Sequence, residues 1–226
     1  IVKPNGGELV TTTAYVNEDN YQNIKASYTL DASGGIVGNA TVKTKGVQYY
    51  QHFRLDQNPK EDVIKHYKNQ WSNINNLKVA NYSLVDNKTE VEFTENVSLN
   101  AMNYASLSGN RILFTVNAFN NNDFVPDRYR NRKLPFEIQR GFFDEDEFEI
   151  QLPEGYTIEA MPNKKHIETE FGTYKVSFEH IPESNTITYS RSLLVKKGYY
   201  PKEKYNDYRN FRKEFTTLQL DLSRYC

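Results

Sequence analysis

The sequence has little cysteine, and this scarcity excludes several kinds of site. Its single cysteine, Cys226, is the last of 226 residues, so the chain has no second thiol for an internal disulfide and no thiolate cluster for a metal ion. The four histidines lie in different predicted elements without HExxH or HxH spacing. No apolar run approaches the roughly 18 residues of a membrane-spanning helix. We therefore expect no metal, no cofactor and no membrane insertion.

Net charge and catalytic motifs are also lacking. The chain carries 28 basic and 29 acidic residues, a balance that gives no overall field to attract nucleic acid or an anionic membrane. It has no GxSxG, GxxxxGK[ST] or GxGxxG motif, and the lone terminal thiol has no positioned base. With 29 acidic residues, many pairs of carboxylates could be imagined as a catalytic pair for glycoside hydrolysis, but the sequence distinguishes none of them. We expect that this chain is not an enzyme by itself, and that it is a monomer.

Large aromatic rings are abundant. The chain has 17 Tyr and 13 Phe, and 38% of its residues are hydrophobic, although its mean hydropathy of -0.77 is polar for a globular domain. Few disordered segments carry so many rings. A folded chain with many half-buried aromatics is therefore predicted.

Alternation of apolar and polar residues dominates the chain and predicts strands. Residues 21–30 and 36–44 form a hairpin around the turn at 31–35, and an extended run follows at 47–56. The loop at 117–123, with four Asn, is predicted to be exposed. Further strands are predicted at 77–86, 89–100, 111–119, 147–152, 172–181, 185–197 and 217–222.

Two stretches have helical spacing instead. After Asn58 and Pro59, the apolar residues of 59–73, which end with Trp71, share one face, and the aromatic residues of 201–215 do the same. The predicted fold is mainly β, an antiparallel β-sandwich with two short helices packed on it. We expect one domain over 1–226, or alternatively two β subdomains over 1–108 and 109–226.

Two charged clusters lie close together in the stretch 130–162. The acidic run 144–149 sits where Phe148 and Ile150 alternate with Glu147 and Glu149, so the acidic residues are predicted to cover the outward face of a strand. Consecutive charges without a central Gly do not fit a calcium loop of the EF-hand type.

The basic cluster is the stronger candidate for binding. Arg128, Arg130 and Arg132 alternate, as they would along an extended segment, and could form one positive row. Its two open interpretations are pairing with nearby carboxylates and recognition of an acidic partner. The pair Tyr199 and Tyr200 is a second candidate, because one ring of such a pair can be exposed and stack on a sugar, whereas the other is buried.

Several segments, taken in order, resemble the tail of a known family. They are GGELV (6–10), RNRKLPFEI (130–138), EIQLPEGYTIEAMP (149–162), GTYKVSF (172–178), ITYSRSLLV (187–195) and PKEKYNDYRNFRKEF (201–215). They are similar to the C-terminal β-domain (DUF3858) of large Bacteroidetes envelope proteins that also carry a DUF3857 domain and a transglutaminase-like, papain-like core.

The resemblance implies that the catalytic Cys, His and Asp belong to a core preceding Ile1, and that this chain is an excised accessory domain located in the periplasm, in the cell envelope or outside the cell. The expected function is to hold that core or its substrate. The alternatives are a stand-alone module that binds a glycan or a peptide, and an independent hydrolase that uses carboxylates.

Overall fold

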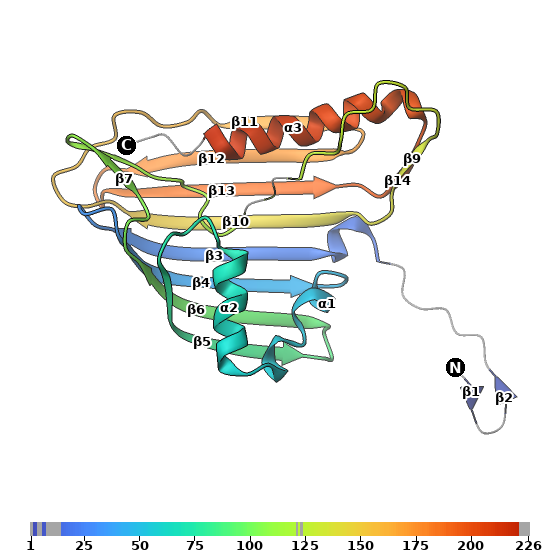
Figure 1. Ribbon diagram of the computed structural model, residues 1–226, viewed down its shortest axis with the longest axis horizontal. Coiled ribbons are helices and arrows are strands. Elements are labelled where there is room, and N and C mark those ends of the chain that lie inside the picture. The colour runs from blue at the N-terminus through green and yellow to red at the C-terminus, as the bar shows by residue number, and fades with distance from the viewer. Residues whose placement is uncertain (1, 4–5, 8–14, 121, 123, 222–226) are drawn as a thin grey trace.

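The computed structural model describes residues 2–3, 6–7, 15–120, 122 and 124–221 (Figure 1). Cys226, Leu222 of the predicted last strand and residues 8–10 of the GGELV segment lie outside this part of the chain.

One large sheet dominates the fold. In the order in which they lie side by side, its strands are β11 (Lys165–Thr169), β12 (Gly172–Ile181), β13 (Thr186–Val195), β10 (Phe142–Gln151), β3 (Tyr21–Leu30), β4 (Ile36–Lys45), β6 (Glu92–Ala101) and β5 (Leu77–Asn87). Neighbouring strands are antiparallel except β10 and β3, which run parallel at the centre of the sheet.

Short elements complete the described chain. Three two-stranded ladders are formed by β1 (Val2–Lys3) with β2 (Gly6–Gly7), β7 (Ser106–Ser108) with β8 (Arg111–Leu113), and β9 (Phe136–Ile138) with β14 (Gly198–Tyr200). The helices are α1 (Tyr49–His52), α2 (Lys60–Gln70) and α3 (Tyr205–Asp221), with 3-10 turns η1 (Asn17–Asp19), η2 (Leu55–Gln57) and η3 (Lys202–Lys204). None of the helices described here has both the length and the apolar character needed to cross a bilayer.

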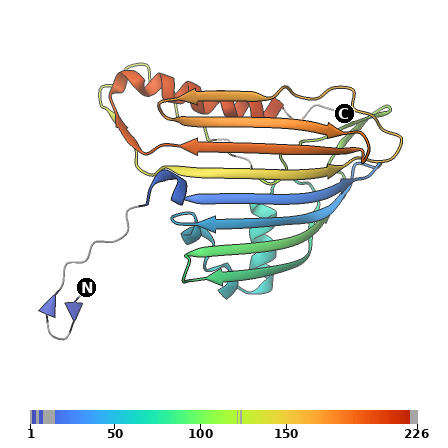
Figure 2. The ribbon, with the colours of Figure 1, turned by 180° about the vertical axis from the view of Figure 1, so that it is seen from behind.

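The helices all lie on one face of the sheet. Helix α2 crosses the half made of β3, β4, β6 and β5, whereas α3 runs along β11 and β12 (Figure 1). Seen from behind, the other face carries none of the described helices (Figure 2). This arrangement follows from the strand alternation, which places apolar side chains beneath the helices and polar ones toward water. The mainly β prediction is confirmed, and the layer opposite the sheet consists of helices and irregular segments.

The sheet joins both halves of the sequence. The strands that follow Ser108 form one side of the sheet and those that precede it form the other, in one continuous hydrogen-bonded order, and the buried apolar residues form one cluster. The parallel contact of β10 with β3 connects the two halves, with Phe148 opposite Ala26 in the register.

The second predicted helix is confirmed, but it continues further than expected. Helix α3 runs to Asp221, so the strand predicted at 217–222 is wrong for residues 217–221. Phe215 is fully buried and stacks on Tyr174 of β12, with the ring centroids 5.6 Å apart. Packing on the sheet therefore stabilises a helix here, although the alternating residues of TLQLDL are typical of a strand.

The extended run predicted at 47–56 is also wrong, because α1 and η2 occupy it. Gly46 has a φ of +59°, which turns the chain out of β4 and onto the helical face of the sheet. The buried residues that follow, Tyr49, His52 and Leu55, recur every three positions rather than every two. This spacing fits a helical turn that covers the sheet.

Candidate functional site

Two aspartates of β10 lie on its buried face. Glu147 and Glu149 point outward as predicted, but Asp144 and Asp146 are only 4% and 0% exposed, so the prediction is wrong for these two residues. Both lie on the same face of the strand as Phe148, whose ring is in the core. A carboxylate at such a position needs charged or hydrogen-bonding partners.

Arg191 supplies the charge. It lies directly opposite Asp146 in the antiparallel register of β10 and β13, and it is 1% exposed. Its Nε is 2.5 Å from Oδ2 of Asp146, and its Nη2 is 3.8 Å from Oδ2 of Asp144. One guanidinium thus serves two carboxylates inside the protein.

The pKa values of both acids reflect this imbalance. Burial raises the pKa of Asp146 to about 6, although the Arg191 guanidinium opposes the rise. Burial also raises the pKa of Asp144, again against the effect of Arg191. Buried acids with raised pKa values beside a pocket mark a candidate functional site.

The asparagine-rich segment supplies amide groups to these acids. The structure places Asn117 and Asn120 at 0% and 8% exposure, so the prediction of an exposed loop is wrong for both residues. The Asn117 amide donates to the carbonyl of Asn120 at 2.6 Å, and Asn120 Nδ2 donates to Asp146 Oδ1 at 3.0 Å. The two side chains therefore satisfy buried polar groups that would otherwise destabilise the core.

A polar pocket opens beside Asp144. It has a volume of about 380 Å³ and lies where β3 and β10 begin, between α1 and the residues Asn120, Asn122 and Phe124. Gln48 Nε2 donates both to Asp144 Oδ1 at 3.0 Å and to the carbonyl of Asn20 at 2.9 Å. The described residues that line it are Asn20, Gln22, Val47, Gln48, Gln51, Asn120, Asn122, Phe124, Arg140, Gly141, Phe142 and Asp144.

Helix α3 holds one wall of this pocket. Arg212 donates from Nε to the carbonyl of Phe124 at 3.0 Å and from Nη2 to Oδ1 of Asn122 at 2.8 Å. Its guanidinium also lies over the Phe124 ring, 5.3 Å from the centroid. The Phe124 side chain is nevertheless 62% exposed, so an anchored backbone presents an aromatic ring at the rim.

The three arginines of the predicted basic row do not lie on a strand. All three lie in an irregular segment, where Arg128 and Arg130 are exposed and Arg132 is partly buried, and among the described residues none of them has an ion pair. Arg132 instead stacks on Tyr205 of α3, with its guanidinium 4.4 Å from the ring centroid. It also donates to the carbonyls of Leu134 and Pro135, so its role is at least partly structural.

Replacement of these arginines should give unequal effects. Arg132→Ala should lower the free energy of unfolding by about 1 to 2 kcal/mol, because it removes a cation–π contact and charged hydrogen bonds. Arg128→Ala, which removes no such contact, should change it by less than about 0.5 kcal/mol. Urea denaturation of both variants is the measurement, and equal effects would contradict the structural role of Arg132.

The second predicted pair has one exposed ring and one partly buried ring. Tyr199 on β14 is 71% exposed, whereas Tyr200 packs against Phe136 and Phe171, with ring centroids 5.3 and 4.9 Å apart. Arg132 lies over the same Phe136 ring, at 5.7 Å. The structure thus brings Arg132 and Tyr200 to one aromatic cluster, and neither residue lines the pocket beside Asp144. Binding by this cluster stays a prediction.

Comparison with known proteins places part of the chain in a described family. A search of curated proteins and a search of solved structures found no match. Residues 110–219 match the model of a family described as a domain of unknown function with a solved structure, DUF3858. This range begins just before β8 and includes β8 to β14 and most of α3, and therefore Asp144, Asp146, Arg191 and Arg212. The match supports the assignment of residues 110–219 of this chain to the DUF3858 family.

Proposed function

We propose that this chain is a non-catalytic accessory β-domain of a larger bacterial envelope protein with a transglutaminase-like core, and that it positions the substrate of that core. The observation that carries the proposal is the lining of the pocket beside Asp144. Its described residues offer amides, one guanidinium and one carboxylate, but no hydroxyl, thiol, imidazole or amine that could serve as a nucleophile. Such a lining suits binding rather than covalent catalysis.

The lining also defines the chemistry of the ligand. Asn and Gln amides both donate and accept hydrogen bonds, so they match the alternating N–H and C=O groups of an extended peptide. The volume of about 380 Å³ accommodates a few side chains and not a whole domain. A peptide segment of the substrate is therefore the proposed ligand.

A second candidate ligand is a glycan. The Phe124 ring at the rim, 62% exposed, provides an apolar surface on which a sugar ring could stack. This alternative corresponds to a stand-alone binding module that does not need a catalytic core.

Ligand binding can be tested by titration of the intact chain with peptide and glycan libraries, observed by NMR shifts. Gln51→Ala should weaken binding several-fold, because Gln51 lines the pocket. Gln57→Ala is the matched control, since Gln57 is an exposed glutamine outside the pocket. Phe124→Ala should weaken glycan binding more than peptide binding. Ligand binding unaffected by Gln51→Ala would contradict the use of this pocket.

The proposed partner requires a separate test. The residues encoded before Ile1 should contain a Cys, a His and an Asp in a papain-like arrangement, and amidase or acyl-transfer activity should require that core. Turnover by this chain alone, abolished by one Asp or Glu substitution, would support the carboxylate hydrolase instead.

A further inference from the structure

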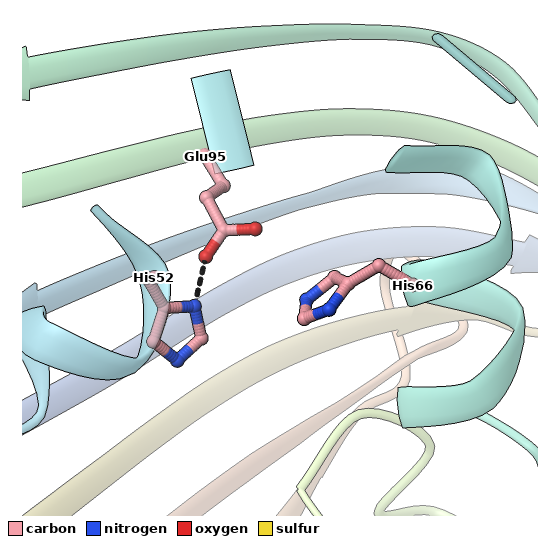
Figure 3. Close-up of side chains that lie close together, drawn as sticks. All are labelled: His52, His66 and Glu95. Atoms are coloured by element: carbon pink, nitrogen blue, oxygen red, sulfur yellow. Dashed lines mark hydrogen bonds and ion pairs between the residues drawn. The ribbon is translucent and has the colours of Figure 1, made fainter. Parts of the chain in front are cut away.

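A second polar cluster lies beneath α2, on the other half of the sheet. His52 at the end of α1, His66 in α2 and Glu95 on β6 converge there (Figure 3). Each offers one potential metal-ligand atom, and these three atoms lie within 4.8 Å of one another. The pocket beside Asp144 does not include any of the three residues.

Glu95 is the deepest member of the cluster. It points inward from β6 between Phe93 and Val97 and is 0% exposed. Its Oε1 lies 2.6 Å from Nδ1 of His52, and its Oε2 accepts a hydrogen bond from the Tyr67 hydroxyl at 2.7 Å. The carboxylate is thereby fixed in orientation, with one oxygen toward the histidines.

His66 is the third member of the cluster, and its Nε2 is not hydrogen-bonded to Glu95 as His52 and Tyr67 are. Its ring projects from α2 toward His52 and Glu95 (Figure 3). Its Nε2 is buried and has no hydrogen-bond partner among the described residues. A buried imidazole nitrogen is normally satisfied, so this unpartnered atom, facing a histidine and a carboxylate, points to a missing ligand.

We propose that His52, His66 and Glu95 bind a divalent transition-metal ion, with zinc as the best fit. Two imidazoles and one carboxylate are a common zinc ligand set, with metal–ligand distances of about 2.0 to 2.2 Å. An ion held by His52 Nδ1 and Glu95 Oε1 would replace the hydrogen bond between these two atoms, and the neutral imidazole would carry its one proton on Nε2 instead. The Tyr67 hydroxyl would remain as the outer partner that orients the carboxylate.

The position of the proposed site suggests that a bound ion would stabilise the packing of the helices on the sheet. The three ligands come from α1, α2 and β6, so a bound ion would tie both helices to the sheet. His66 is only half-buried, which provides a route of entry. With three protein ligands, a tetrahedral ion keeps its fourth position open to water.

The test uses the intact chain after treatment with a chelator, with Co²⁺ and Zn²⁺ as probes. We expect one ion per chain, Co²⁺ absorption bands typical of tetrahedral coordination that Zn²⁺ abolishes, and a higher melting temperature with Zn²⁺. His66→Ala should weaken binding by more than about 100-fold, since loss of an outer partner alone costs about 10- to 100-fold. His166→Ala, which removes an exposed histidine elsewhere, is the matched control and should bind normally.

Two results would overturn the proposal. The first is a folded wild-type chain that binds neither ion at micromolar concentration, which would leave the cluster as a hydrogen-bonded link between helices and sheet. The second is undiminished binding by His66→Ala. Because Glu95→Gln could impair folding at a fully buried position, the decision rests on the half-buried His66, whose Nε2 makes no hydrogen bond among the described residues.

Discussion

Trp71→Ala should lower the free energy of unfolding by about 3 to 5 kcal/mol, the range typical of large aromatic truncations in a core. Trp71 follows α2 directly and is 0% exposed, as the apolar face of the predicted helix indicated. The cost arises because the side chain is surrounded by rigid neighbours that cannot collapse into the space left behind.

The contacts of Trp71 explain this rigidity. Its ring stacks on Tyr67 with the centroids 5.2 Å apart and meets the edge of Phe119 at 5.1 Å. Its Nε1 donates to the carbonyl of Phe119 at 3.1 Å. Truncation therefore removes both packing and a buried hydrogen bond, and it loosens α2 from the segment that lines the pocket.

Chemical denaturation followed by circular dichroism measures the effect. Tyr199→Ala, at a 71% exposed ring, is the control and should change stability by less than about 0.5 kcal/mol. Fluorescence of the wild type provides an independent check, because a buried indole emits at short wavelength. An emission maximum typical of exposed indole in the folded protein would contradict the burial of Trp71.

Local periodicity predicted much of this fold. The β3–β4 hairpin, the helix beginning after Pro59 and the inward position of Trp71 all follow from the spacing of residues close in sequence. The errors at 47–56 and 217–221 occurred where strand and helix patterns both fit a short stretch. In both places packing on the sheet determined the conformation, and local sequence does not contain that information.

The buried charges were within reach of the same reasoning. Strict alternation from Phe148 back along β10 puts Asp146 and Asp144 on the apolar face, and alternation from Tyr189 puts Arg191 there too. Charged residues are seldom fully buried, so the charges of these three residues suggested exposed positions, whereas the alternation placed them on the buried face. The strand register places Asp146 directly opposite Arg191, so the two opposite charges neutralise each other and both side chains can be buried.

The pocket and the histidine cluster could not be predicted in this way. Asn20, Gln48 and Asp144 meet only because β3 and β10 pair in parallel across more than a hundred residues of sequence. His52 and Glu95 likewise meet only when α1 folds back over the sheet. Such contacts depend on topology, for which a single sequence offers no local signal.

Arg191→Met should destabilise the protein by about 3 to 5 kcal/mol at neutral pH, because it leaves buried carboxylates without their cation. The methionine preserves most of the apolar volume, so the loss is chiefly electrostatic. Asp146→Leu combined with Arg191→Met should recover part of this stability, since replacement of an ion pair by apolar groups is often neutral, whereas Asp144 still lacks its cation.

The defect should also depend on pH in a defined direction. The pKa of Asp146 is raised by burial to about 6, above its ordinary value of 3.8, so the folded state binds this proton more tightly than the unfolded state. The stability linked to Asp146 is therefore fully present below pH 3.8 and is lost as the pH rises through about 6. Without Arg191, which opposes the rise, the pKa should be higher still, and the loss should continue to higher pH.

The measurement is the difference in unfolding free energy between wild type and Arg191→Met from pH 5 to 8. It should be larger at pH 8 than at pH 5, because at pH 5 the unpaired Asp146 can take up a proton and become neutral. In the double variant this dependence should be weaker, since Asp146 is gone and only Asp144 remains to titrate. A difference independent of pH in the single variant would mean that Arg191 stabilises the core by packing alone, and that the two aspartates are not held by its charge.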